Sequence, residues 1–107
     1  MGSTNYVIQP LETVTVWDDA EPIIPTVTKS VIVTNNGETK LEVVNYWAPP
    51  SHVFYPDTTY WVEPNDTIIV QAPERSFYYY RVNVTNSDDT KVGAAIVEIV
   101  DHHHHHH

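Results

Sequence analysis

His52 is the one histidine of this sequence that is available for acid–base chemistry. The run from 102 to 107 has the form of a purification tag and is not treated as part of the domain. A catalytic nucleophile needs a base within hydrogen-bond reach, and Ser51 directly precedes His52. Adjacent side chains of an extended chain point to opposite faces, so we do not expect these two residues to form a dyad.

Carboxylates offer a second kind of chemistry. The chain has 14 acidic residues, so some pairs will lie close together as the two carboxylates of a glycoside hydrolase do. Hydrolysis also needs a cleft, which a sandwich of about 100 residues rarely encloses. We therefore expect that the protein is not an enzyme.

Acidic loops are the candidates for metal binding. Asp18, Asp19 and Glu21 form an oxygen-rich stretch of the kind that calcium prefers, and residues 86–89 form another. Neither stretch has the helix-flanked pattern of a known calcium loop, and a solvated acidic turn explains both equally well. The chain has no cysteine, which excludes thiolate-ligated zinc, iron–sulfur and blue-copper sites. No cofactor is expected.

Aromatic residues are the most informative feature. Two clusters occur, one over residues 46–61 and one over the consecutive run 77–80. Consecutive residues of a strand alternate between faces, so part of each cluster is expected at the surface. Exposed aromatic side chains that share a sheet face mark recognition sites. The candidate binding face consists of Tyr46, Trp47, Tyr55, Tyr60, Trp61, Phe77 and Tyr79.

Two uses of such a face compete with a purely structural one. Flat rings can stack on sugar faces, as in a carbohydrate-binding module. Tyrosine and tryptophan are also enriched in protein interfaces. The structural alternative is that large rings simply cover the edges and loop ends of the sheets.

The elements that must position these residues are strands. Valine, isoleucine, threonine, tyrosine and tryptophan dominate the composition, and 8 prolines oppose long helices. Alternating apolar residues, as in 27–34, 40–47, 77–85 and 92–100, are separated by turn residues at spacings of about 8–12 positions. This pattern predicts an all-β fold, a seven- to eight-stranded antiparallel immunoglobulin-like β-sandwich that forms one domain over residues 4–101.

The order of motifs resembles the major sperm protein domain and its PapD-like relatives over residues 8–70. The segments that carry the resemblance are Ile8-Gln9-Pro10, Val31-Ile32-Val33-Thr34-Asn35, Asn36-Gly37, Leu41-Glu42-Val43-Val44, Ala48-Pro49, the stretch 53–56 and Val62-Glu63-Pro64-Asn65-Asp66-Thr67. The resemblance implies an immunoglobulin-like sandwich that acts in protein association. The strand 41–46 lacks the lysines with which relatives capture acidic peptides, so that activity is not implied.

Charge narrows the choice of partner. The net charge is −9, with 14 acids against 5 bases, which disfavours binding to nucleic acid. No stretch approaches the roughly 18 apolar residues of a membrane span, so no membrane insertion is expected. The sequence favours a structural or protein-interaction module, with self-association through the aromatic face or through 92–100 as an exposed edge strand. Carbohydrate binding and a virion or cell-surface decoration domain are the alternatives.

Overall fold

The structure, a computed structural model, describes residues 2–19, 29–71 and 77–101. Within these ranges the regular secondary structure consists of strands, and no helix is long and apolar enough to cross a bilayer. The eight strands are β1 (Ser3–Ile8), β2 (Thr13–Asp19), β3 (Lys29–Asn35), β4 (Leu41–Ala48), β5 (Tyr55–Val62), β6 (Thr67–Val70), β7 (Tyr79–Asn86) and β8 (Gly93–Asp101).

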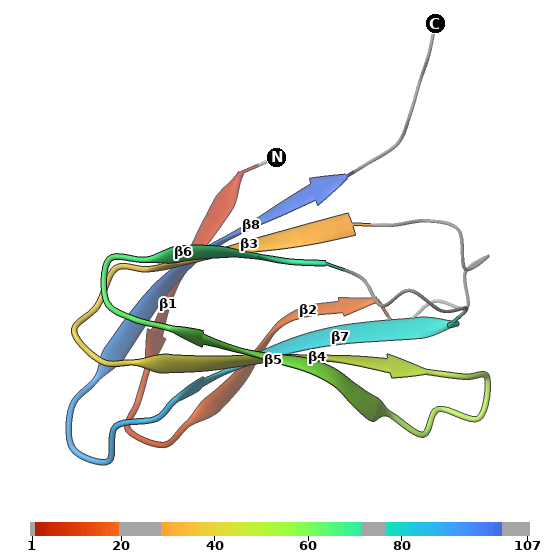
Figure 1. The fold of residues 1–107 in the computed structure, drawn as a ribbon, viewed down its shortest axis with the longest axis horizontal. Coiled ribbons are helices and arrows are strands. Elements are labelled where there is room, and N and C mark those ends of the chain that lie inside the picture. The colour runs from red at the N-terminus through yellow and green to blue at the C-terminus, as the bar shows by residue number, and fades with distance from the viewer. Residues whose placement is uncertain (1, 20–28, 72–76, 102–107) are drawn as a thin grey trace, which may run out of the picture.

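The described strands form two antiparallel sheets of four strands that pack face to face (Figure 1). One sheet has the order β1-β8-β3-β6 and the other has the order β2-β7-β4-β5. This arrangement confirms the predicted antiparallel all-β sandwich. Among the described ladders, β4–β5 alone joins strands that are consecutive in the sequence.

This strand order is that of a jelly roll, in which two Greek keys wrap around one core. An immunoglobulin-like sandwich keeps its first two strands together in one sheet. Here β1 and β2 lie in opposite sheets, so the strand order differs from the immunoglobulin order.

The position of β8 corrects one expectation about association. The stretch 92–100 was expected to be an exposed edge because it carries a single charge, Glu98. Instead β8 lies between β1 and β3 and pairs with both. Its apolar character reflects a central position in the sheet, and it has no free edge for another chain.

The core follows the predicted alternation. Val31 and Val33 of β3 face Leu41 and Val43 of β4 across the interior, and all four are fully buried. Alternate residues of β7 and β8 complete the core with Tyr80, Val82, Val84, Ala95 and Val97. Period-two patterning therefore selected the inner face of these strands correctly.

Three fully buried asparagines connect the two layers through directional bonds. In each case the side-chain Nδ2 donates to a main-chain carbonyl oxygen in the opposite sheet, or in the residue directly after a strand of that sheet. The bonds run from Asn35 of β3 to Val62 of β5 at 2.9 Å, from Asn86 of β7 to Ile8 of β1 at 3.1 Å, and from Asn45 of β4 to Gln71 after β6 at 2.9 Å.

The strand and turn geometry differs from the usual pattern for proline and glycine at two places, Pro56 and the turn 35–37. β5 runs through Pro56, although proline cannot donate to the ladder, because β5 is an edge strand, where proline is tolerated. The turn 35–37 joins different sheets, and neither asparagine nor glycine takes a positive φ. Gly37 is needed because a Cβ there would lie 2.6 Å from the main-chain nitrogen of Ala94.

Candidate binding surfaces

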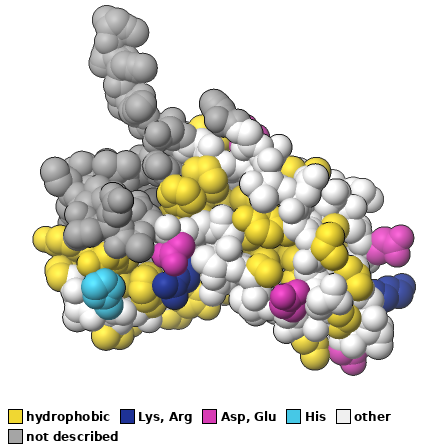
Figure 2. All heavy atoms as spheres, turned by 180° about the vertical axis from the view of Figure 1, so that it is seen from behind, with side chains coloured by type: hydrophobic (Ala, Val, Ile, Leu, Met, Phe, Trp, Pro, Cys, Tyr) yellow, Lys and Arg dark blue, Asp and Glu magenta, His cyan; other side chains and the backbone are white. Residues whose placement is uncertain are grey.

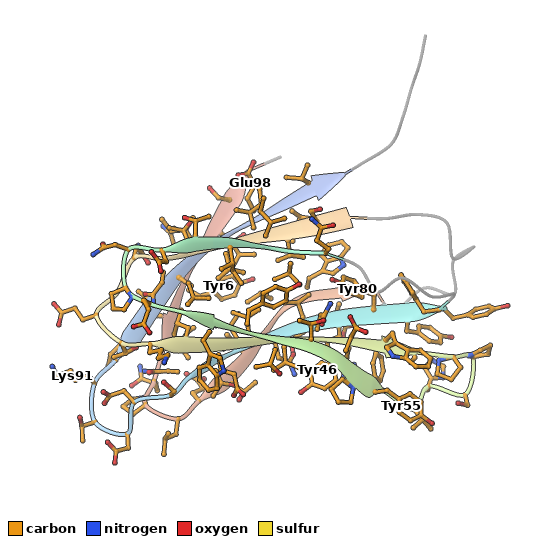
Figure 3. All side chains as sticks on the ribbon, viewed as in Figure 1. Tyr6, Tyr46, Tyr55, Tyr80, Lys91 and Glu98 are labelled. Atoms are coloured by element: carbon orange, nitrogen blue, oxygen red, sulfur yellow. The ribbon has the colours of Figure 1, made fainter. Side chains whose placement is uncertain are left out.

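The predicted aromatic face is divided between surface and interior. Trp61 and Tyr55 are 53% and 45% exposed, while Tyr46, Trp47 and Tyr60 are half-buried. Trp47 and Tyr55 pair across β4 and β5, with ring centroids 5.0 Å apart. Figure 3 shows Tyr80 between the sheets, whereas Tyr46 lies outside the β2-β7-β4-β5 sheet and Tyr55 lies at its end.

Phe77 and Tyr79 were expected at the surface, and both are buried. Side chains alternate between faces only within a strand. Because β7 begins at Tyr79, the alternation does not hold for residues 77 and 78, the first two of the aromatic run. Phe77 packs on Tyr80 in the core, with ring centroids 5.7 Å apart. Tyr78, which the alternation predicts on the inward face together with Tyr80, is instead the exposed ring of this run, at 40%.

Tyr79 points away from the core, as expected, but the β4–β5 loop covers it. His52 stacks on its ring with centroids 4.1 Å apart, and the Phe54 centroid lies 6.5 Å away. The His52 amide donates to the Pro49 carbonyl at 3.0 Å, and its φ of 70 lies in the left-handed region, where histidine occurs more often than most residues. This loop geometry places His52 against an aromatic ring at the outer surface of β7.

Arg81 extends this cluster along the same face of β7. Its guanidinium carbon lies 4.1 Å from the Phe54 ring centroid, which is a cation–π contact, and one nitrogen lies 3.4 Å from the Asp18 carboxylate. Asp18 and Asp19 lie in β2 instead of the predicted loop. Asp18 therefore faces a guanidinium, while Glu21 lies outside the described residues. The described part of the chain contains no group of three or more potential metal ligands.

Apart from Tyr46 and the ring cluster of His52, Phe54 and Tyr79, the outer surface of the β2-β7-β4-β5 sheet is mostly polar, and we call this part the threonine face. It is built from cross-strand pairs of short polar side chains. Thr13 and Thr85 share a hydroxyl–hydroxyl bond of 2.6 Å, and the Thr15 hydroxyl donates to the Asn83 side chain at 2.8 Å. Trp61 lies at the β5 edge of this face, opposite Glu42 of β4.

A basic side chain lies beside Trp61. The Lys40 ammonium is 5.3 Å from the ring centroid and 3.3 Å from the Glu63 carboxylate. The threonine face thus presents an accessible ring next to hydroxyl, amide and charged groups. Such groups can hydrogen-bond to a polar ligand while the ring supplies a flat apolar contact.

The outer surface of the β1-β8-β3-β6 sheet is different and was not predicted. Aliphatic residues cross all four strands, and we call this set the aliphatic stripe. Its members are Val7 of β1, Ala94 and Ile96 of β8, Ile32 of β3 and Ile69 of β6.

The strand register makes the members of the stripe neighbours along a diagonal of the sheet, with Glu98 of β8 directly opposite Ile32. Val7 lies opposite Ala94, and Ile32 lies opposite Ile69. Ile96 pairs with Asn5 and Thr34, which places it diagonally next to both Val7 and Ile32. Val7 and Ile69, at the two ends, are 66% and 51% exposed. The sequence signal for this face was the unbroken apolar run in 31–33 and 95–97, which is typical of a strand that is apolar on both faces.

The family model described as PirA-like matches residues 3–96. The chain belongs to the PirA-like family. The crystal structure of PirA is similar to this PirA-like chain, with a TM-score of 0.75 and 25% sequence identity over 94% of this chain and 93% of PirA. No curated protein sequence matches the chain.

Two structures of Drosophila melanogaster CENP-C share the fold. CENP-C bound to CAL1 aligns with a TM-score of 0.54 at 12% identity, over 91% of the PirA-like chain and 60% of the CENP-C chain. The CENP-C cupin domain aligns with a TM-score of 0.52 at 11% identity, over 94% and 59% of the two chains. At these identities the likeness concerns the fold alone, and it agrees with the strand order because cupins are jelly rolls.

The comparisons do not support the resemblance to the major sperm protein domain and its PapD-like relatives. Its motifs were an asparagine-containing turn and prolines that precede strands. Both also occur in this jelly roll, at Asn35 and Asn36 and at Pro64. Turn chemistry of this kind follows from antiparallel strands in general and does not separate one sandwich family from another.

Proposed function

We propose that this PirA-like domain is a non-catalytic protein-association module that binds through the aliphatic stripe. The observation that carries the proposal is the diagonal row of exposed or half-buried aliphatic side chains that reaches all four strands of the β1-β8-β3-β6 sheet. The solvent face of an antiparallel sandwich is ordinarily polar. A contiguous apolar patch with a polar rim marks an interaction surface.

The arrangement of the stripe suits a protein interface. Ile96 and Ile32 lie on the two central strands, and Val7 and Ile69 lie on the two edge strands. Binding energy in protein interfaces concentrates at such a centre, surrounded by a polar rim. The polar residues of this face are Asn5, Thr34, Thr67 and Glu98, which alternate with the stripe and border it on both sides. Completing the burial of one aliphatic side chain contributes at most about 1.5–3 kcal/mol, so several must act together.

The test compares an Ile69→Ser variant with a Thr67→Ser control on the same face of β6. Retention on a phenyl-substituted resin and the concentration dependence of the mass in light scattering are measured for both. We expect Ile69→Ser to weaken retention and association and Thr67→Ser to leave both unchanged. Equal behaviour of the two variants would contradict a docking role for the stripe.

A specific observation favours carbohydrate binding by the threonine face as a second candidate function. Trp61 is exposed at the edge of a surface lined by hydroxyl and amide groups, and an aromatic ring of this kind stacks on the apolar side of a sugar. Affinity electrophoresis through gels that contain xylan or soluble cellulose derivatives tests this function. We expect retardation that is lost in Trp61→Ala and kept in Tyr78→Ala, which removes an exposed ring directly before β7. Unretarded migration in every polysaccharide tested would count against this candidate.

A further inference from the structure

The four edge strands of the described sandwich are not equally protected against pairing with another chain. β2 has a bulge between Thr15 and Trp17 and two consecutive acidic residues at its end. β5 contains Pro56 and Asp57, and its pairing with β4 shifts register at the same place. Bulges, charges and proline are the features by which natural sheets prevent edge-to-edge association. Both edges of the β2-β7-β4-β5 sheet are therefore blocked.

The other sheet has one short edge and one open edge. β6 spans only the four residues Thr67–Val70, and a very short edge strand is itself a protection. β1 has six residues, Ser3–Ile8, that pair with β8 in unbroken register. It contains no charged residue and no proline, although the chain as a whole has a net charge of −9. Among the four described edges, β1 is the one that meets none of the protective criteria.

We propose that β1 pairs antiparallel with β1 of a second copy of this chain, so that two β1-β8-β3-β6 sheets join into one. This inference rests on the association role of the proposed function, for which it names a second copy as the partner and the β1 edge, with Val7 of the stripe, as the contact. Main-chain hydrogen bonds of the free edge supply the pairing, as in other cases of strand addition. A two-fold axis relates the copies, so each β1 is both donor and acceptor.

The alternation of side chains limits the register of this pairing. Opposite residues of an antiparallel pair project from the same side of the sheet, so the two-fold axis must pass through a residue of β1. An axis through Tyr6 places Val7 opposite Asn5 of the partner. The two Val7 side chains are then diagonal neighbours, about 7–8 Å apart. An axis through Val7 would pair only residues 6–8 of β1, whereas the axis through Tyr6 pairs residues 4–8 and still brings the two aliphatic stripes together, which selects this register.

Charge does not oppose this contact despite the acidic composition. The charged residue of β8 nearest to β1 is Glu98, which lies opposite Ser3 at the far end of the strand. With the axis at Tyr6, the two Ser3 residues are about 20 Å apart along the strand direction. That separation exceeds the Debye length of about 8 Å at physiological salt. Figure 2, which shows the molecule from behind, has hydrophobic side chains in the middle and charged side chains on both sides of them.

Light scattering of the full chain over a concentration series is the first measurement. We expect the mass to rise from 12.2 kDa toward twice that value. Asn5→Lys puts a charge on the solvent side of the edge strand and should weaken dimerisation by about tenfold or more. A mass that stays at 12.2 kDa up to about millimolar concentration overturns the proposal.

Ile69→Ser separates this proposal from the proposed function. Ile69 lies on β6, at the opposite edge of the sheet from β1. If Asn5→Lys weakens association and Ile69→Ser has little effect, pairing through β1 is supported and docking through the whole stripe is not. If Ile69→Ser weakens association and Asn5→Lys does not, pairing through β1 is overturned while the stripe keeps its role.

Disulfide trapping tests the register, because the chain contains no cysteine. With the axis at Tyr6, the two Cα atoms at that position are about 4.5–5.5 Å apart, within disulfide range. A Tyr6→Cys variant should form a covalent dimer on mild oxidation. The Asn5→Cys variant is the matched control, since its two copies are diagonal and beyond disulfide range. Cross-linking of Asn5→Cys but not Tyr6→Cys overturns the register, and circular dichroism of each variant verifies the fold.

Discussion

The two outer faces of the sandwich use side chains of nearly the same shape for opposite purposes. On the threonine face, Thr13 and Thr85 form a cross-strand hydroxyl pair, and on the aliphatic stripe Ile32 and Ile69 form a cross-strand hydrocarbon pair. Both kinds of residue are β-branched and favour strands. Strand formation therefore leaves the polarity of each face undecided. Isoleucine in place of threonine on a surface that faces water is the difference on which the proposed role in association rests.

The largest expected effect comes from a substitution that removes hydrogen bonds between the two sheets, on whose packing both outer faces depend. Asn35→Ala leaves the Val62 and Thr39 carbonyls, both now bonded to the Asn35 amide, without their partner. We expect the free energy of unfolding in urea to fall by about 3 kcal/mol, because buried polar groups lose their hydrogen bonds. Asn36→Ala, an exposed neighbour, is the control and should stay within about 0.5 kcal/mol. Equal stability of the two variants would show that the bridges do not hold the layers.

The next effect concerns Tyr80, which is buried in the core between the two sheets. The Tyr80 hydroxyl has no hydrogen bond of good geometry among the described residues; burial raises its pKa to about 12, and the nearby Asn45 side chain offsets this only in part. Tyr80→Phe should therefore stabilise the fold by about 1 kcal/mol at pH 7, since an unpaired buried hydroxyl is removed. Urea denaturation of the variant and the parent chain measures the difference.

The pH dependence of Tyr80→Phe has a definite sign. The unfolded tyrosine ionises near pH 10, whereas the folded one stays protonated until about pH 12. The parent chain consequently loses stability as the pH rises through this window, by up to about 2–3 kcal/mol. The Tyr80→Phe variant lacks this loss, so its advantage should grow above pH 10. An advantage that stays constant across this window, while Tyr55→Phe behaves as the parent does, would contradict the assigned burial.

Exchanging the chemistry of the two faces sharpens the comparison directly. Val7→Thr with Ile69→Thr makes the ends of the stripe polar, and Thr13→Val with Thr85→Val makes a polar row apolar. Each exposed substitution should change stability by no more than about 0.5 kcal/mol. Retention on a phenyl resin should fall for the first pair and rise for the second. Retention that follows neither exchange would mean that the faces do not differ as surfaces.

The smallest effect belongs to the ion pair on the threonine face. Asp18→Asn removes the carboxylate that lies 3.4 Å from Arg81, and both side chains are partly exposed. We expect a loss of about 0.2–1 kcal/mol at low salt, and a smaller one at high salt because ions screen the pair. Thermal unfolding at two salt concentrations measures it, with Asp89→Asn as the control. A larger loss at high salt than at low salt would rule out a simple ion pair.

The inner half of the fold could be predicted from sequence, and the outer half could not. Alternation identified Leu41, Val43, Val82 and Val84 as inward, because only inward positions of these strands must be apolar. The order of strands depends on long-range pairing that no local pattern encodes, which is why β8 was mistaken for an edge. A turn signal in the sequence shows that the chain reverses, but it does not show which strands then pair, so the same turns are compatible with many antiparallel strand orders.

The candidate surfaces divide in the same way. Trp61 and Tyr55 were placed outside correctly, since a strand must put one of two adjacent rings on each face. The prediction for Tyr79 was wrong because His52, from the β4–β5 loop, covers its ring, and a strand pattern does not show where a loop folds. The aliphatic stripe was missed because its residues come from four separate strands, and each looked like part of a core. Continuity across a sheet becomes visible only when the register is known.

The asparagine bridges have a consequence for how such a domain can change. They bond to main-chain carbonyls, which every residue type supplies, so they do not depend on the side chains of the residues they reach. Residues on the outer face of either sheet can therefore be substituted, by evolution or by design, without loss of the hydrogen bonds that join the two sheets. The interior of this jelly roll is in this sense a reusable frame on which new specificities can be mounted.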